Sequence, residues 1–373
     1  MILNERMPVW RYMHRAVRVF DPTLLIGVAL LISLSLVTMH SAAIDYPGRF
    51  DAHLRNLLLS LGVMVFAAHL PIGVWMRAAA PLYLTGIALL VAVALFGDIS
   101  KGARRWLDIG ITRIQPSEIL KIATPLMIAW YFQRREGARY WYDFLIAVGL
   151  VVVPVLLIAR QPDLGTAILV GASGTFVIFL ARLPWRVILL AIVAGLAGLP
   201  LLWSVMKEYQ RQRVLTLLDP EADPLGKGFH IIQSKIAVGS GGLWGKGWME
   251  GTQTHLEFIP ERTTDFIFAV LAEEFGFVGA MVLLAIYLLV VGRGLLVSAQ
   301  APNDFMRLLA GALTLTLFTY AFVNLGMVSG ILPVVGVPLP LMSYGGTAMV
   351  TLGFGFGLLF NIASRRRPRP IPP

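Results

Sequence analysis

The 373-residue sequence contains no cysteine, and only 14% of its residues are charged, against about 25% in an average soluble protein. Without cysteine, a disulfide scaffold and a cysteine-ligated metal site are excluded. Hydrophobic residues make up 57% of the chain. That much apolar side chain cannot be hidden in one water-surrounded core of this size, which argues against an ordinary soluble domain. The net charge of +10 is compatible with nucleic acid, an acidic substrate or an anionic membrane.

Nucleotide-binding and zinc-binding motifs are also missing. The glycine-rich stretch 239–251 approaches a P-loop at Gly245-Lys246, but Ser240 stands at the first required glycine and Gly247 at the last position, which needs serine or threonine. The six histidines are scattered, without an HExxH motif or a pair at helical spacing. A protein-ligated zinc site is therefore not expected.

Long apolar runs dominate what is present. A bilayer-spanning helix needs about 20 mostly apolar residues. Ten segments qualify, at 23–40, 57–76, 78–97, 116–133, 143–159, 164–181, 187–206, 276–297, 308–332 and 339–363. The sequence predicts an all-α polytopic integral membrane protein, a single transmembrane domain over residues 1–373. The basic N-terminus resembles a signal peptide, but nine further spans follow, so we expect an uncleaved first helix.

The distribution of lysine and arginine predicts the orientation of the spans. With the N-terminus in the cytoplasm, the inner segments hold sixteen of these residues and the short outer loops eight. Both termini are then cytoplasmic, and the basic tail 364–373 suits anionic lipid headgroups. Counting acidic residues as well, the inner side carries +11 and the outer side −1. The excess positive charge is an orientation signal, so nucleic acid is not needed to explain it.

Two predicted outer loops stand out by length. The first, at 98–116, joins spans three and four, and the second, at about 207–275, lies between helices seven and eight. The second is too apolar and aromatic for a solvated linker, and its stretch Leu225–Gly251 is typical of a structured segment with glycine turns. We therefore expect the chemistry on the extracytoplasmic side.

Asp265 is the first candidate for that chemistry. Thr263 or Thr264 could cap a helix whose first turn contains Asp265, which would make it an ordinary helix-start carboxylate. Seven consecutive apolar residues follow it, however, which places it at the membrane surface. Partial desolvation there raises a carboxylate pKa and suits a general base.

Glu118 and Lys121 are three residues apart, on one face of the fourth span, and can pair. Ionisable residues at membrane depth usually face a cavity. The pair is either a structural brace or the wall of a polar cavity open to the outside.

Basic residues in the outer loops form the second group of candidates. Adjacent arginines at 104 and 105 suit a phosphate or diphosphate, while the neighbouring Trp106 could also belong to the interfacial aromatic belt. Lys235 and Arg262 add cations in the long loop. Asp163 is expected to cap or turn the chain.

One external carboxylate with several cations favours a particular reaction class. Hydrolysis of a glycoside usually needs two carboxylates, one of which protonates the leaving oxygen. A glycosyl diphosphate needs no such acid, because its leaving group departs as an anion, so one base and cations suffice. The residues therefore suit a lipid-diphosphate sugar donor, but they do not by themselves identify which one.

Longer motifs add a family resemblance. The stretches are Arg105-Trp106-Leu107, 115–121 (QPSEILK), 161–166 (QPDLGT), 209–213 (YQRQR), 218–226 (LDPEADPLG), 230–237 (HIIQSKIA), 256–262 (LEFIPER), 264–269 (TDFIFA), 330–340 (GILPVVGVPLP) and 343–346 (SYGG). In these motifs the chain resembles the SEDS family (shape, elongation, division and sporulation), most closely its rod-shape-determining branch. Thr263, where a close relative is expected to have histidine, and the Arg/Pro-rich tail are small departures.

The resemblance implies ten helices with both termini inside and a peptidoglycan glycosyltransferase in the bacterial cytoplasmic (inner) membrane. The implied substrate is lipid II, polymerised with inversion and departure of undecaprenyl diphosphate during cell elongation. Asp265 stands at the family's essential acidic position and would be the general base. Trp106 matches a tryptophan needed for activity, and Glu118 and Lys121 match the pair lining a central cavity.

The resemblance also implies a divalent cation, Mg²⁺ or Mn²⁺, whose ligands cannot be assigned. The implied partners are a class B penicillin-binding protein, which crosslinks the new glycan, and the elongation machinery. The same topology would suit a lipid II flippase, and a non-catalytic scaffold for the cell-wall machinery is a third reading. The external carboxylate and the structured outer loop favour the enzyme.

Overall fold

The computed structural model describes residues 19–100, 103–108, 113–137, 140–182, 185–206, 208–222, 227–256, 258–259 and 261–365. Most of the predicted basic tail, residues 366–373, lies outside this range.

Helices account for nearly all of the described secondary structure. They are α2 (Pro22–Ala42), α3 (Arg49–His69), α4 (Ile72–Phe96), α5 (Pro116–Arg134), α6 (Trp141–Arg160), α7 (Leu164–Leu180), α8 (Trp185–Ala197), α9 (Leu199–Val205), α10 (Glu208–Leu218), α11 (Lys227–Ser240), α12 (Thr252–His255), α13 (Ile267–Ala299), α14 (Asp304–Val328) and α15 (Gly346–Ala363), with a 3₁₀ turn, η1, at Pro220–Ala222. Within the described part of the chain, seven of them are long and apolar enough to cross a membrane, namely α2, α3, α4, α6, α13, α14 and α15. The prediction of an all-α polytopic membrane protein is confirmed.

The three other predicted spans also correspond to helices. α5 contains the charged residues Glu118 and Lys121, and α7 has 17 residues. The seventh span is divided into α8 and α9. Each of the ten predicted apolar segments therefore overlaps a helix, although only seven helices in the described part of the chain are long and apolar enough to cross a membrane.

Several span boundaries were predicted wrongly, two of them with clear physical reasons or consequences. The second and third spans separate at Leu70-Pro71, not near residue 77, because Pro71 lacks an N–H and stands at the N-cap of α4. The tenth helix begins at Gly346, not at 339, and residues 331–345 form an irregular segment. This segment proves to line the candidate site.

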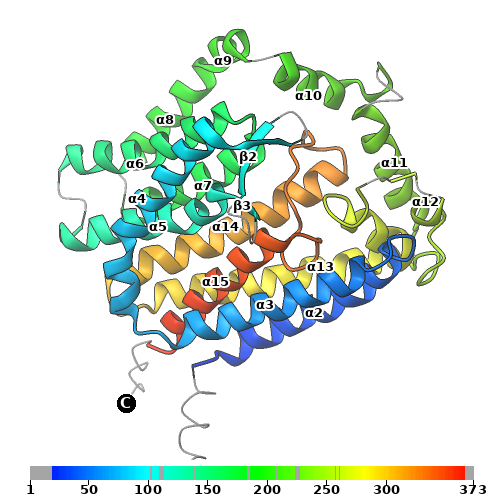
Figure 1. The fold of residues 1–373 in the computed structure, drawn as a ribbon, viewed down its shortest axis with the longest axis horizontal. Helices are drawn as coiled ribbons and strands as arrows, with labels where there is room; N and C mark the ends of the chain where they lie inside the picture. The colour runs from blue at the N-terminus through cyan, green and yellow to red at the C-terminus, as the bar shows by residue number, and fades with distance from the viewer. Residues whose placement is uncertain are drawn as a thin grey trace, which may run out of the picture.

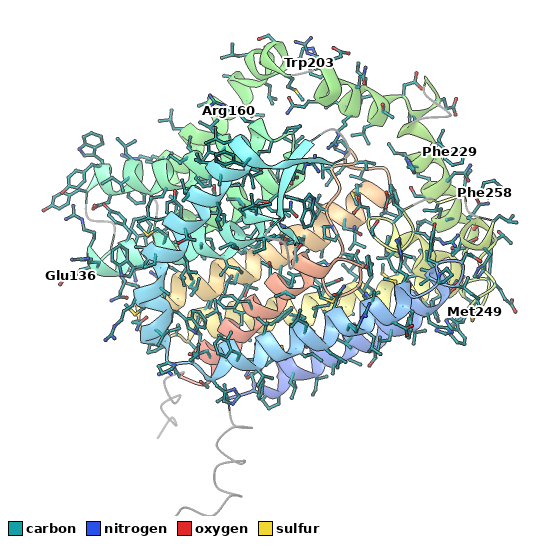
Figure 2. All side chains as sticks on the ribbon, in the orientation of Figure 1. Glu136, Arg160, Trp203, Phe229, Met249 and Phe258 are labelled. Atoms are coloured by element: carbon teal, nitrogen blue, oxygen red, sulfur yellow. The ribbon has the colours of Figure 1, made fainter. Side chains whose placement is uncertain are left out.

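The helices pack in pairs, some of helices that are distant in sequence and some of consecutive helices. α3 lies along α15 and α2 lies along α13, while α4 packs on α5 and α6 on α7 (Figure 1). α8 and α9 lie on the outside of the bundle, with leucines such as Leu190, Leu196 and Leu201 exposed. Glu136 lies at one end of the molecule, and Met249 and Phe258 lie at the opposite end (Figure 2).

Both long outer loops are structured where they are described. The first contains three short antiparallel strands, β1 (Asp98–Ser100), β2 (Ala103–Asp108) and β3 (Arg113–Ile114), in the order β1-β2-β3. The second contains α10, η1, α11 and α12. The prediction that this loop extends to residue 275 is wrong, because α13 already begins at Ile267.

α13 is interrupted at Gly276, whose φ of 64° is left-handed. The glycine-rich turn 241–247 fills the interruption: the N–H groups of Lys246 and Gly247 donate to the carbonyls of Glu273 (3.0 Å) and Glu274 (3.1 Å). In return, Phe277 N–H donates to the Gly242 carbonyl (2.9 Å). A Cβ at Gly245 would overlap the Glu274 carbonyl. The glycines that resembled an incomplete P-loop motif instead allow the backbone of this turn to approach the backbone of α13 closely.

Candidate active site

A polar cavity of about 530 Å³ opens among α5, the first outer loop and the segment preceding α15. Five of the seven site residues predicted from the sequence line it: Arg105, Trp106, Glu118, Lys121 and Asp265. The complete lining is Arg105, Trp106, Gln115, Glu118, Lys121, Asp163, Thr166, Leu169, Thr264, Asp265, Gly336, Pro338, Tyr344, Gly345, Gly346, Thr347 and Ala348. The fold thus gathers residues from five separate parts of the sequence around one space.

Asp265 lies in the turn 261–266, directly before α13. The expectation that a threonine caps the helix is wrong: Phe266 is the N-cap and makes no side-chain cap bond. Thr263 Oγ1 instead accepts a hydrogen bond from Arg49 Nη1 (2.8 Å), and Thr264 Oγ1 donates to Glu261 Oε2 (2.9 Å). These threonines therefore brace the turn that carries the carboxylate.

The same turn is bonded to the irregular segment before α15. Tyr344 N–H donates to the Thr263 carbonyl (2.8 Å), and Ser343 Oγ donates to the Thr264 carbonyl (2.5 Å). A Cβ on Gly336 would lie 3.4 Å from Asp265 Oδ2, so the carboxylate faces this glycine closely. The irregular segment and the turn form one wall of the cavity.

Glu118 and Lys121 form the predicted pair. Lys121 Nζ lies 2.6 Å from Glu118 Oε1, and the two side chains are only 4% and 8% exposed. Lys121 Nζ also lies 5.2 Å from the centre of the Tyr320 ring on α14. Both residues line the cavity wall. The pair can therefore brace the structure and also contact a ligand in the cavity.

Arg105 reaches the cavity from β2. Its guanidinium donates to the Pro162 carbonyl and lies 4.0 Å from Asp163 Oδ2, with 35% of the side chain exposed. Asp163 is the predicted cap: it is the N-cap of α7 and accepts from Thr166 N–H (3.2 Å). The side chain of Arg104 lies outside the described side chains.

Comparison with known proteins identifies the family to which this chain belongs. The model of the family described as "Cell cycle protein", FTSW_RODA_SPOVE, matches residues 13–368. The chain belongs to the FtsW/RodA/SpoVE family. The resemblance inferred from the motifs is confirmed.

Relatives within the FtsW/RodA/SpoVE family agree in sequence and structure. The chain is 54% identical over 348 residues to "Peptidoglycan glycosyltransferase MrdB" of Escherichia coli K12, covering 93% of this chain and 94% of that protein. A solved chain from a peptidoglycan synthase complex superposes with a TM-score of 0.81 at 35% identity, covering 93% of this chain and 98% of that one. RodA of Thermus thermophilus superposes with a TM-score of 0.71 at 30% identity, with 94% and 98% coverage.

Two predicted site residues of this FtsW/RodA/SpoVE protein lie outside the cavity. Arg262 is fully buried: its guanidinium donates to the carbonyls of Ala42 (3.0 Å) and Thr254 and pairs with Asp45. Lys235 lies exposed on α11, beside Gly330. Arg262 braces the connection between α2 and α3 against the active-site turn, and neither residue lines the space where a substrate would bind.

Other lining residues were not singled out as site residues from the sequence. Gln115, Thr166 and Tyr344 lie within the motifs that carry the FtsW/RodA/SpoVE resemblance, which was the available signal. Arg49 and Asn324, which hold the Asp265 turn, lie outside those motifs and gave no sequence signal.

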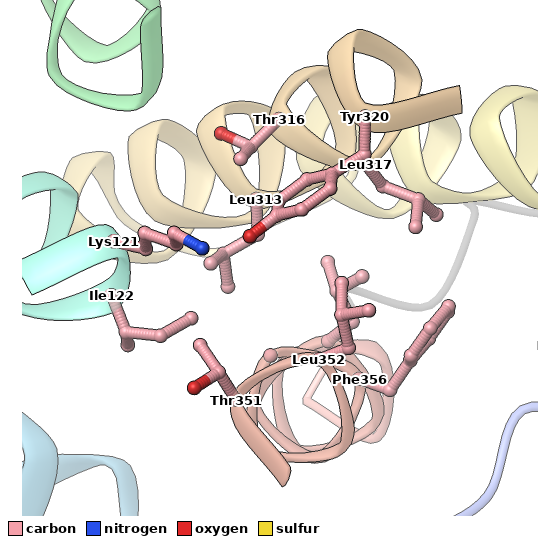
Figure 3. A pocket seen from close by; sticks show the side chains of 11 residues that line it. Lys121, Ile122, Leu313, Thr316, Leu317, Tyr320, Thr351, Leu352 and Phe356 are labelled. Carbon is pink, nitrogen blue, oxygen red and sulfur yellow. The ribbon is translucent and has the colours of Figure 1, made fainter. Parts of the chain in front are cut away.

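An apolar pocket adjoins the polar cavity, and Lys121 lines both. Its other residues come from α5, α14 and α15 and include four leucines, Ile122, Phe356 and Tyr320. Figure 3 shows the Lys121 amine directed toward the Tyr320 side chain at the edge of this pocket. Lys121 of this FtsW/RodA/SpoVE protein therefore stands between a polar cavity and an apolar pocket.

A resident metal ion does not fit this site. In the described part of the chain, no three histidine, aspartate or glutamate side chains are grouped closely enough to hold one. We therefore derive no step through a metal, and the divalent cation stays a prediction.

Proposed function

We propose that this protein is a peptidoglycan glycosyltransferase that polymerises lipid II into glycan strands during cell elongation. The name of its 54%-identical relative supports the reaction class. The observation that carries the chemistry is the placement of Asp265 in one cavity with Arg105, Trp106 and the Glu118–Lys121 pair.

In the proposed reaction, Asp265 is the general base. Its carboxylate accepts the proton of the acceptor GlcNAc 4-hydroxyl, whose oxygen attacks C1 of the donor MurNAc. A new C1–O bond forms as the bond from C1 to the diphosphate oxygen breaks, and the configuration at C1 inverts. Undecaprenyl diphosphate leaves as an anion, so a second, acidic carboxylate is not required.

The cations of the cavity act on the leaving group. Arg105 presents a planar guanidinium suited to phosphate oxygens, and its partial exposure leaves it accessible. Lys121 lies where the polar cavity meets the apolar pocket. A lipid diphosphate needs that combination, with its charged group at the cations and its prenyl chain in apolar surroundings. Trp106 adds an aromatic wall against which a sugar ring can pack.

Cellular placement and partnership follow from the same proposal. The chain is a multi-pass membrane protein. We propose that it lies in the bacterial inner membrane, and the charge asymmetry supports both termini being cytoplasmic. One structural relative is a chain of a peptidoglycan synthase complex. This supports assembly with a synthase, which we propose to be a class B penicillin-binding protein.

Proteoliposomes containing the purified protein, that partner and fluorescent lipid II test the proposal. Polymerisation would appear as glycan chains that lysozyme digests, and translocation as a change in the accessibility of the label. The proposal expects polymer formation that needs this protein and falls sharply in Arg105→Ala. Translocation of lipid II without polymer would overturn it in favour of a flippase.

A further inference from the structure

The turn that fills the interruption of α13 exposes two large apolar side chains at its tip. Leu243 is 65% exposed and Trp244 is 80% exposed. The charged residue of the turn, Lys246, points inward and binds Glu273 Oε1 at 2.8 Å. The tip thus has an apolar outer surface, although the sequence placed it in a periplasmic loop. Such a surface indicates an interaction site.

An ion pair at the other end of the bundle provides a reference for depth. Arg293 on α13 binds Asp21, the N-cap of α2, through two contacts of 3.0 and 2.8 Å. Charges are unfavourable within hydrocarbon, and the Arg293 side chain is 25% exposed. The pair therefore marks the inner polar boundary of the membrane on both helices.

The turn contacts both helices at the same height above that pair. Phe277 and Val278 N–H groups donate to the Gly242 (2.9 Å) and Leu243 (3.1 Å) carbonyls. Trp248 Nε1 donates to the Val37 carbonyl on α2 (3.1 Å).

These contacts lie within the thickness of the hydrocarbon layer. Sixteen residues separate Phe277 from Arg293, and sixteen separate Asp21 from Val37. At about 1.5 Å per helical residue, each interval is about 24 Å. The hydrocarbon core is about 30 Å thick. Measured from the Arg293–Asp21 pair along either helix, the turn lies at or below the outer boundary of the core.

The apolar tip is continuous with the lipid-facing surface of α13. Phe277, Val278 and Met281, just beyond the interruption, are 40–55% exposed. Non-helical backbone is tolerated at membrane depth when its polar groups are bonded to protein, and the turn bonds across the interruption in both directions. A tryptophan at this level belongs to the interfacial belt.

We propose that Leu243 and Trp244 form a re-entrant anchor that binds the outer leaflet of the bilayer at the boundary of headgroups and acyl chains. The occupant of this surface is lipid. The anchor does not depend on the glycosyltransferase reaction. Through Gly276 it fixes the depth of the short helix 267–275, and with it the height of Asp265 above the acyl chains.

The absence of native cysteine makes site-directed spin labelling direct. Leu243→Cys and Trp244→Cys are labelled with a nitroxide in phosphatidylcholine/phosphatidylglycerol nanodiscs, and collisions with oxygen and with a water-soluble nickel chelate are measured. Leu289→Cys on the exposed face of α13 serves as the lipid control. Asp219→Cys, beyond α10, serves as the water control.

We expect oxygen-to-nickel accessibility ratios at 243 and 244 close to that of 289 and several-fold above that of 219. Ratios like that of 219 would overturn the anchor, and so would low accessibility to both reagents caused by a protein partner.

Brominated lipids give a second test that requires no labelled variant. They should quench part of the tryptophan fluorescence of the unmodified protein, and Trp244→Phe should remove part of that quenching. Equal quenching of the two proteins would contradict the proposal even if a cysteine variant failed to fold.

Discussion

Asn324 Nδ2 on α14 donates a hydrogen bond of 2.8 Å to the backbone carbonyl of Asp265. The same nitrogen donates to the Val337 carbonyl at 2.7 Å, and Asn324 is fully buried. One amide group therefore joins α14 to both parts of one cavity wall, the Asp265 turn and the irregular segment. It holds the proposed base through its backbone, so the position of the carboxylate depends on a residue that does not line the cavity.

Replacing that donor should impair catalysis. Asn324→Asp keeps the side-chain size but presents oxygen to two carbonyls, which displaces the Asp265 turn. We expect kcat to fall at least about tenfold, which corresponds to about 1.4 kcal/mol in the barrier, with little change in KM. Asn361→Asp is the matched control, because Asn361 makes the same kind of bond to the Ala68 carbonyl (2.8 Å) near the other end of α15. It should lower the unfolding midpoint without a selective effect on kcat. An unchanged kcat in Asn324→Asp would disprove the positioning role.

Variants of the Glu118–Lys121 pair can distinguish its contribution to stability from its contribution to polymerisation. Glu118→Gln leaves a buried, unpaired ammonium and should cost about 3–5 kcal/mol of unfolding free energy. Exchanging the charges, as Glu118→Lys with Lys121→Glu, should recover much of the thermal stability. Polymerisation should stay low, since the cation has moved away from the apolar pocket. Full activity in the exchanged variant would show that the pair is only a structural brace.

The glycine turn predicts a contrast between two alanine substitutions. Gly245 has a φ of +83°, and a Cβ there would overlap the Glu274 carbonyl, so Gly245→Ala should destabilise the protein by about 2 kcal/mol or more. Gly239→Ala is the matched control, because nothing lies within 4 Å of a Cβ at this helical position. It should be neutral or slightly stabilising. Thermal unfolding in detergent compares the two, and equal midpoints would contradict the tight approach of the turn to α13.

The sequence predicted those features that depend on local pattern. The predicted apolar runs all overlap helices, and the three-residue spacing of Glu118 and Lys121 predicted their pairing. The role of Arg262 was not accessible in this way, since its partner Asp45 lies 217 residues away and an unpaired cation in an outer loop resembles a ligand. The helical start at Ile267 was missed because the interruption at Gly276 is stabilised by a turn that is distant in sequence.

His230 on α11 predicts an acid-dependent loss of stability. Its ring stacks on Phe266 at 5.9 Å, next to Asp265. Burial lowers the pKa of His230 below 6.5, and the nearby Glu261 only partly opposes this effect. As the pH falls below about 6.5, His230 therefore binds a proton more readily in the unfolded chain than in the folded protein. The stability present above that pH is lost as the pH falls toward the lowered pKa of the folded state. His230→Gln should show a smaller drop in unfolding midpoint between about pH 7.5 and 5.5 than the unmodified protein. An identical drop would mean that other groups carry the acid sensitivity.

The central claim is that Asp265 accepts the proton of the attacking hydroxyl. Its most direct test is the rate of lipid II polymerisation by purified Asp265→Asn with the penicillin-binding partner, measured beside Asp163→Asn, which alters another carboxylate of the same cavity. Removing a general base costs about 10²–10⁴-fold, so Asp265→Asn should lose at least about a hundredfold in kcat while retaining its unfolding midpoint. Asp163→Asn should lose far less. Polymerisation by folded Asp265→Asn at the unmodified rate would contradict the account.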